Sequence, residues 1–175
     1  MTAPVFVDSN VLLYWRDAGQ PVKQPLAAAW LEQLWREGNG RTSCQVLNEY
    51  YVHATGKLRP GLDPDDAWDD VLALMCWNPQ AMTADVMSRA REIERRYRLS
   101  WWDSLIVASA QLQDCSVLLT EDLQDGARLG SVVVRSPFAL SISEAAVEYP
   151  AVRRRSRHPP RGRPRQPNRA PEVRT

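Results

Sequence analysis

The stretch Val5-Phe6-Val7-Asp8-Ser9-Asn10-Val11-Leu12 decides the fold that we expect for this chain of 175 residues. Its apolar start predicts a short buried strand over 4–7, and the apolar run from residue 11 predicts a helical turn. Asp8 stands between the two. It is typical of a helix N-cap, which is a structural role, and equally of a carboxylate at the carboxyl end of a central strand, where open α/β sheets place their sites.

A second continuous apolar run, 116–120, predicts a strand at the centre of a parallel sheet, and Asp122 follows it. Strand-like and helical segments alternate between the two runs, which favours an α/β fold with crossover helices. If the two predicted strands are neighbours, Asp8 and Asp122 lie at the same sheet edge, about 5 Å apart. The further strands that we expect are at 42–44, 79–82 and 131–135.

Two more acids could join this edge. Glu49 lies on a predicted helix over 45–55, where the ordinary interpretation is a solvated acid. Asp103 opens the apolar helix that begins near residue 101, and its spacing from Ser100 fits a capping box, again a structural role. His53, one turn after Glu49, is a weak metal signal by itself.

The four acids together are harder to explain structurally than each acid alone. Carboxylates gathered at one sheet edge repel each other, and a divalent cation removes that conflict. Oxygen ligands without nearby cysteine select hard ions, Mg²⁺ or Mn²⁺. Such ions catalyse phosphoryl transfer by activating water and stabilising charge on the reacting oxygens. The sequence therefore suggests a metal-dependent hydrolase that acts on phosphodiester bonds.

The ordered set of segments over about residues 4–138 resembles the PIN-domain ribonucleases, especially the VapC-like toxins of toxin–antitoxin pairs. The resemblance implies a three-layer α/β/α fold with strand order 3-2-1-4-5. It also implies Mg²⁺-dependent cleavage of RNA, a homodimer and a small antitoxin whose tail blocks the cleft. The segments that carry it are 5–12, 48–49, 99–110 and 118–123. The residues that match the family's site are the acids Asp8, Glu49, Asp103 and Asp122, with Ser9, Asn10 and Thr120 as supporting polar residues.

We therefore expect a Mg²⁺-dependent endoribonuclease, with Mn²⁺ as a possible substitute. Asp8, Asp103 and Asp122 would coordinate the metal, and Glu49 would bind metal or orient water as a general base. One alternative is a PIN-like module that binds RNA or protein without turnover, which the complete set of acids argues against. Another is an aspartyl-nucleophile phosphatase, which commonly has a second Asp where this chain has Asn10.

Charge divides the chain into an acidic body and a basic tail. Residues 1–150 hold 13 Lys and Arg against 20 Asp and Glu, whereas 151–175 hold nine Arg and one Glu. We expect one nuclease domain over 1–138, a weakly patterned extension over 139–150 and a disordered Arg- and Pro-rich tail over 151–175, either a solubilising end or a contact to RNA phosphates. Three widely spaced cysteines and no visible signal peptide or membrane-length apolar run indicate a soluble cytoplasmic protein without membrane contact.

Overall fold

A central, mostly parallel sheet organises the computed structural model, which describes residues 3–139. The predicted tail lies outside that range, as does all of the predicted extension except Ala139. The strand order is β2-β1-β3-β5-β4, and only the β4–β5 pair is antiparallel. The strands are β1 (Val5–Val7), β2 (Gly40–Arg41), β3 (Val117–Leu119), β4 (Arg128–Leu129) and β5 (Val132–Arg135).

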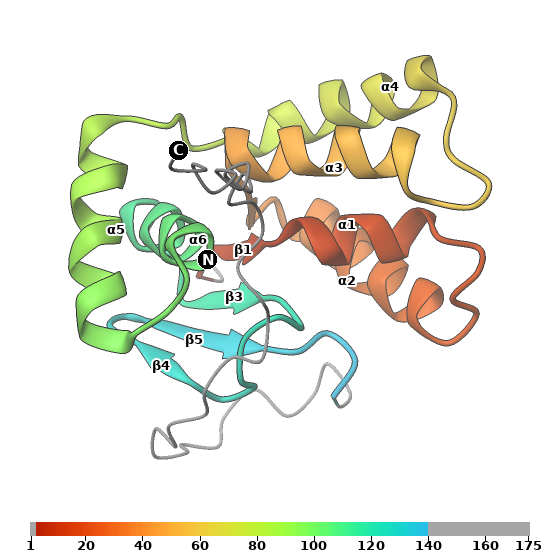
Figure 1. Cartoon of the computed structure of the whole chain (residues 1–175). Coiled ribbons are helices and arrows are strands. Elements are labelled where there is room, and N and C mark those ends of the chain that lie inside the picture. The colour runs from red at the N-terminus through yellow and green to blue at the C-terminus, as the bar shows by residue number, and fades with distance from the viewer. Residues whose placement is uncertain (1–2, 140–175) are drawn as a thin grey trace, which may run out of the picture.

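Within the described part of the chain, six α-helices complete the three-layer α/β/α architecture (Figure 1). Figure 1 shows α3 running beside α4, and α5 beside α6, while α1 packs against both α2 and α3. The helices are α1 (Ser9–Arg16), α2 (Lys23–Glu37), α3 (Cys44–Gly56), α4 (Pro64–Leu74), α5 (Ala84–Tyr97) and α6 (Trp101–Leu112), with a 3₁₀ turn, η1, at Met75–Trp77. None of the helices between residues 3 and 139 is long and apolar enough to cross a bilayer.

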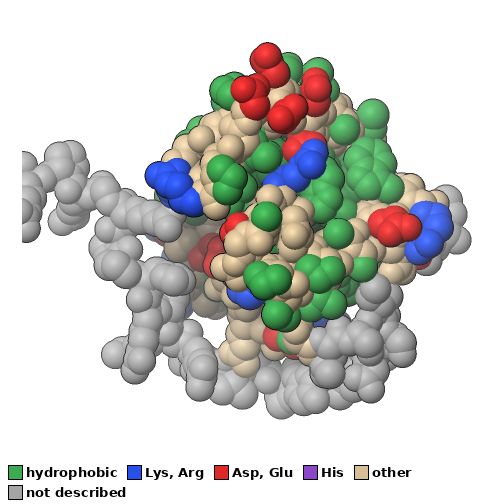
Figure 2. Space-filling model, turned by 90° about the vertical axis from the view of Figure 1, so that its right-hand side faces the viewer, with side chains coloured by type: hydrophobic (Ala, Val, Ile, Leu, Met, Phe, Trp, Pro, Cys, Tyr) green, Lys and Arg blue, Asp and Glu red, His purple; other side chains and the backbone are tan. Residues whose placement is uncertain are grey.

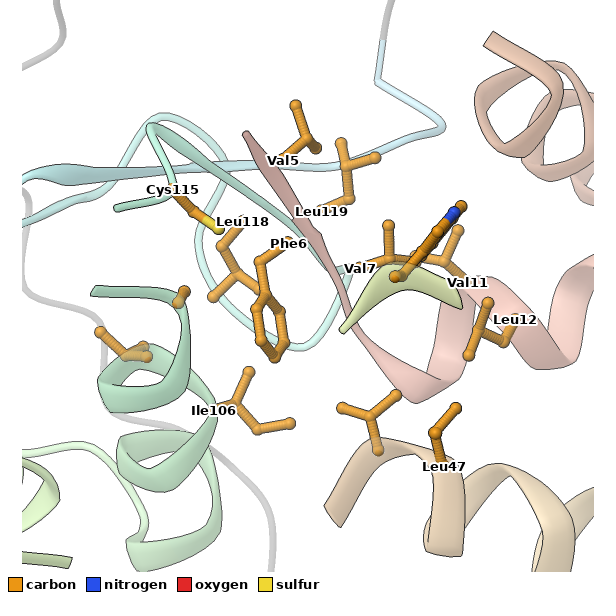
Figure 3. Close-up of a cluster of buried hydrophobic side chains, with 14 of the residues drawn as sticks. Val5, Phe6, Val7, Val11, Leu12, Leu47, Ile106, Cys115, Leu118 and Leu119 are labelled. Carbon is orange, nitrogen blue, oxygen red and sulfur yellow. The ribbon is translucent and has the colours of Figure 1, made fainter. Parts of the chain in front are cut away.

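The two apolar runs are neighbours in the sheet, as predicted. β1 and β3 pair in parallel, with Val5 opposite Val117 and Val7 opposite Leu119. Figure 3 shows that Phe6 and Leu118 point toward Ile106 of α6, whereas Val5 and Leu119 point to the opposite face of the sheet. All these side chains except Val117 are buried, so both faces of the strands are covered. This two-sided burial explains why the runs are continuously apolar.

The edge strands differ in detail from the predicted order 3-2-1-4-5. The strand expected at 79–82 is a single parallel bridge between Ser43 and Gln80. Pro79 has no amide to extend that ladder, and Thr83 already caps α5. At the other edge the chain adds the short antiparallel strand β4. If the bridge at Gln80 is counted as the third strand, the five predicted strands have the predicted neighbours. β4 is then an additional strand outside the last predicted one.

The strand expected at 42–44 is displaced, because Ser43 instead caps α3. Its hydroxyl accepts a hydrogen bond from the amide of Val46 at 3.3 Å, so the helix begins at Cys44. The strand β2 lies two residues earlier, at Gly40–Arg41. The helix still carries Glu49 on its second turn, so the shift does not move the expected site.

One buried acid of α4 holds three helices together. Asp70 accepts hydrogen bonds from Arg16 of α1, with Nε 2.8 Å from Oδ2, and from the Tyr50 hydroxyl of α3. The sequence predicts that the acids of this helix, Asp65, Asp66, Asp69 and Asp70, serve as capping residues and as a solvated face. For Asp70 this prediction is wrong, since only 5% of the residue is exposed. The other acids of α4 are exposed, and acidic side chains gather at the top of the face drawn in Figure 2, where α4 lies.

Candidate metal centre

Asp8 lies at the centre of the candidate site, directly after β1 and 7% exposed. Both interpretations of its position are compatible, because it caps α1 and also points its carboxylate into a polar cluster. Its Oδ1 accepts the Ser9 amide at 2.7 Å, which starts the helix. Its Oδ2 accepts the Thr120 hydroxyl at 2.7 Å and the Asn10 amide at 3.2 Å. The carboxylate is therefore held in one orientation by donors from two strand ends.

Asp122 joins Asp8 through the polar residues between them. Asn10 Nδ2 lies 3.2 Å from Asp122 Oδ2, 3.2 Å from Asp8 Oδ2 and 2.9 Å from Thr120 Oγ1. The Asp122 amide donates to Thr120 Oγ1 at 3.1 Å, which turns the chain after β3. The parallel pairing of β1 and β3 thus brings the acids of the two strand ends to one edge, as the sequence predicted.

Glu49 approaches the same cluster from α3. Its Oε2 accepts the Ser9 hydroxyl at 3.0 Å, and that hydroxyl also lies 3.4 Å from Asp8 Oδ1. Its Oε1 accepts Gln45 Nε2 at 3.1 Å, from one turn earlier on the helix. Glu49 is therefore not a solvated surface acid: both of its oxygens are bonded by side chains, and Ser9 connects it to Asp8.

Asp103 takes the position of a capping residue on α6. The Ser100 hydroxyl donates to its carboxylate at 2.7 Å and accepts its backbone amide at 3.1 Å, so the predicted capping interaction is present. Its connection to the other acids runs through the neighbouring residue. Gln45 Nε2 also lies 3.5 Å from the Trp102 carbonyl, which places the first turn of α6 beside Glu49.

Electrostatics at this edge favour a bound cation. The pKa of Asp8 is raised from its ordinary 3.8 to about 7, mainly by burial and in smaller part by the negative charges of Asp122 and Glu49. Hydrogen bonds from Thr120 and Ser9 lower this pKa, although not enough to offset burial. Within residues 3–139, no Lys, Arg or His forms an ion pair with these three acids. The fold itself therefore leaves their charge uncompensated.

The donor set fits a hard divalent ion. Its members are carboxylate oxygens, and two further oxygens, Asn10 Oδ1 and Gln45 Oε1, are buried without a hydrogen-bond partner in the described part of the chain. Between residues 3 and 139, no group of three or more acidic, histidine or cysteine side chains is arranged so that it could hold a metal ion by itself. Water would therefore complete the coordination, as is usual for Mg²⁺.

Gln45 is the site neighbour that the sequence interpretation missed. It lies in the first turn of α3, is 9% exposed, and bonds both Glu49 and the start of α6. A polar residue at a helix start gives no signal of this role in the sequence, apart from its spacing of one turn before Glu49. Asp125 lies outside this cluster and accepts the Ser136 amide at 2.8 Å, directly after β5 ends.

A cation does lie near this edge, but it is used elsewhere. Lys23 Nζ bonds Glu121 Oε2 at 2.6 Å and the Tyr14 hydroxyl at 3.0 Å. Glu121 precedes Asp122 in the chain but belongs to this second cluster. The side chains that donate hydrogen bonds to the acids of the candidate site are therefore all neutral.

Comparisons with known proteins agree with this architecture. The family model described as PIN domain matches residues 5–125. No curated protein sequence matches the chain. A toxin–antitoxin complex from Klebsiella pneumoniae is similar in structure, with a TM-score of 0.58 and 22% identity, over 78% of this chain and 99% of that one. The Mycobacterium tuberculosis toxin VapC20, described as cleaving the sarcin–ricin loop, has a TM-score of 0.49 and 21% identity, over 65% and 86% of the two chains.

Proposed function

Because the chain belongs to the PIN-domain family, we propose that it is a Mg²⁺-dependent endoribonuclease and the toxin of a toxin–antitoxin pair. The observation that carries this proposal is the uncompensated group of acids at the ends of β1 and β3. Asp8, Glu49 and Asp122 share the donors Ser9, Asn10 and Thr120, and none of the three acids has a cationic partner in the described part of the chain.

Three of the acids are proposed as metal ligands because of where they lie. Asp8, held in orientation by Thr120 and Ser9, and Asp122, held by Asn10, would bind the ion, together with Asp103 at the start of α6. When bound, Mg²⁺ supplies a water of lowered pKa and stabilises charge on the attacking and leaving oxygens of the phosphodiester.

Glu49 is the general base in this proposal. Ser9 and Gln45 each hold one of its oxygens, so the carboxylate has a fixed orientation in which to accept a proton from the attacking water. No side chain of the protein needs to form a covalent intermediate.

The family and one of the similar structures support a proposal for the partners of this chain. One of the similar structures is described as a toxin–antitoxin complex. We propose a cognate antitoxin that covers the acidic edge, and a homodimer as the state of the free toxin. Sedimentation of the purified chain, alone and with the product of an adjacent short reading frame, tests both assemblies.

Removal of the metal tests the activity most directly. The purified chain should cleave unpaired RNA in Mg²⁺ or Mn²⁺, stop in EDTA and resume when Mg²⁺ is restored in excess. Products should carry the ends left by water attack, without a protein–phosphate adduct after acid quench. Undiminished cleavage in EDTA would overturn the metal mechanism. A phosphate group on Asp8 would favour the aspartyl-nucleophile scheme instead.

A further inference from the structure

One tryptophan at the start of α6 is exposed beside the candidate metal centre. Trp102 is 61% exposed and directly precedes Asp103. The other half-exposed tryptophans contact a second ring: Trp35 lies 5.0 Å from Trp77, and Trp68 lies 6.1 Å from Tyr51, measured between ring centroids. Within residues 3–139, the Trp102 ring makes no aromatic or cation–π contact. Its indole faces are therefore available to a ligand.

The backbone of Trp102 is tied to the acids. Gln45 Nε2 bonds Glu49 Oε1 at 3.1 Å and approaches the Trp102 carbonyl at 3.5 Å. Gln45 is buried, so this connection is rigid compared with a surface contact. Trp102 therefore lies at the rim of the site, one amide side chain away from the proposed general base.

The charge of the site makes an aromatic contact useful there. Glu49, Asp103 and Asp122 repel phosphates, so substrate next to the metal needs contacts that do not depend on charge attraction. Stacking of a nucleobase on an aromatic ring is such a contact, and it is largely independent of base identity. A base inside a duplex is already stacked on both faces, whereas an unpaired base can turn out and stack on protein.

We propose that Trp102 stacks on an unpaired base of the RNA next to the phosphodiester that is cut. The inference rests on the proposed function and narrows its substrate class to single-stranded segments and loops. In this proposal the exposed Trp102 ring binds RNA. The alternatives that the test must exclude are contact of the ring with a second copy of the chain or with a protein partner.

Binding to synthetic RNA tests the contact separately from cleavage. The probe is a fluorescein-labelled single-stranded oligoribonucleotide, with a set of copies that each lack one base. Anisotropy is measured in EDTA at low salt, using the full chain, so that the Arg-rich tail contributes backbone affinity. The proteins are the parent, Trp102→Ala, Trp102→Phe and the matched control Trp68→Ala, which removes another half-exposed tryptophan, on α4.

Trp102→Ala should weaken single-strand binding by about five- to 150-fold, while Trp102→Phe and Trp68→Ala stay near the parent. Removing the base at one position should weaken parent binding by a similar factor and should have no further effect in Trp102→Ala. Duplex RNA of the same sequence should bind parent and Trp102→Ala equally.

The inference is overturned if Trp102→Ala binds every RNA as the parent does, or if base removal and Trp102→Ala act additively at all positions. A change in sedimentation of Trp102→Ala without a change in RNA binding would assign the ring to a second copy instead. Failure of the proposed function looks different. In that case the parent would not cut RNA in Mg²⁺, whatever the binding experiment gives.

Discussion

Two buried aspartates of this protein are treated in opposite ways by the fold. Asp70, 5% exposed, is paired with Arg16 and with the Tyr50 hydroxyl, so its charge is compensated inside the packing of α1, α3 and α4. Asp8, 7% exposed, is surrounded by neutral donors and has two acids nearby. Buried charges normally have a partner. The difference indicates that Asp70 serves stability, and it supports the proposal that Asp8 binds a cation.

The largest effect should come from removing the charge of Asp8. We expect Asp8→Asn to lower the rate of RNA cleavage by about a thousandfold or more, equivalent to about 4 kcal/mol of activation free energy. Mg²⁺ should raise the melting temperature of the parent and that of the variant much less. Asp69→Asn, an exposed acid of α4, is the control and should behave like the parent. Equal Mg²⁺ stabilisation of parent and Asp8→Asn would remove Asp8 from the metal centre.

Removing the charge of Asp70 should instead lower stability. Asp70→Asn leaves Arg16 without its counter-charge and weakens the acceptor for the Tyr50 hydroxyl. We expect a loss of about 2 kcal/mol in the free energy of unfolding, less than for a fully buried pair because Arg16 is partly exposed. Urea unfolding in EDTA measures it, and Tyr50→Phe, with a loss of about 1 kcal/mol, separates the hydroxyl from the ion pair. A variant as stable as the parent would mean that Asp70 holds nothing together.

A pH series should sharpen the contrast. Burial raises the pKa of Asp8 in the folded state to about 7, so its contribution to stability is complete below pH 4 and is lost as the pH rises through 7. Asp122→Asn removes one repelling charge and keeps an acceptor for Asn10. In EDTA at pH 8 this variant should be at least as stable as the parent, by up to about 1 kcal/mol.

At pH 5 folded Asp8 is protonated, so the advantage of Asp122→Asn should largely disappear. Thermal melts at both pH values decide the point. A variant that is less stable than the parent by the same amount at pH 5 and pH 8 would show that Asp122 has a structural role and does not repel Asp8.

The smallest effect on chemistry should come from the tail. A chain that ends at residue 150 should cleave saturating RNA at the parental rate, because the acids all lie within residues 3–139. Its RNA binding should depend less steeply on salt, since nine arginines are removed. Lost cleavage at saturation would mean that the tail supplies part of the site.

The sequence predicted what depends on local pattern and strand order. The two continuous apolar runs identified β1 and β3, and their pairing explains why Asp8 and Asp122 meet. Prediction from the sequence failed where the role of a residue depends on a contact with a residue far away in the chain. Asp70 looked solvated among exposed acids, because nothing local indicates that Arg16 lies 54 residues earlier in the sequence but adjacent in space. Gln45 was missed for the same reason, since its second contact is on α6.

The weak edge of the sheet was also beyond local pattern. Residues 79–82 have the composition of a short strand, but only Gln80 bridges to Ser43. Whether such a segment forms a ladder depends on the amides that face its neighbour, and Pro79 lacks one. At the other edge, β4 was not expected, because a run of two residues is too short to show a strand pattern.

The last described residues are held against α1 and α2. The Phe138 ring packs edge-on against Tyr14 with centroids 5.1 Å apart, and Trp30 donates to the Pro137 carbonyl at 3.3 Å. Tyr14 in turn bonds Glu121, the neighbour of Asp122. The described part of the chain therefore ends beside the neighbour of Asp122, and everything after residue 139 is covalently joined to the body near that point. Under the proposed function, RNA bound by the arginines after residue 150 would be kept at a high effective concentration near the acids, even if each contact is weak.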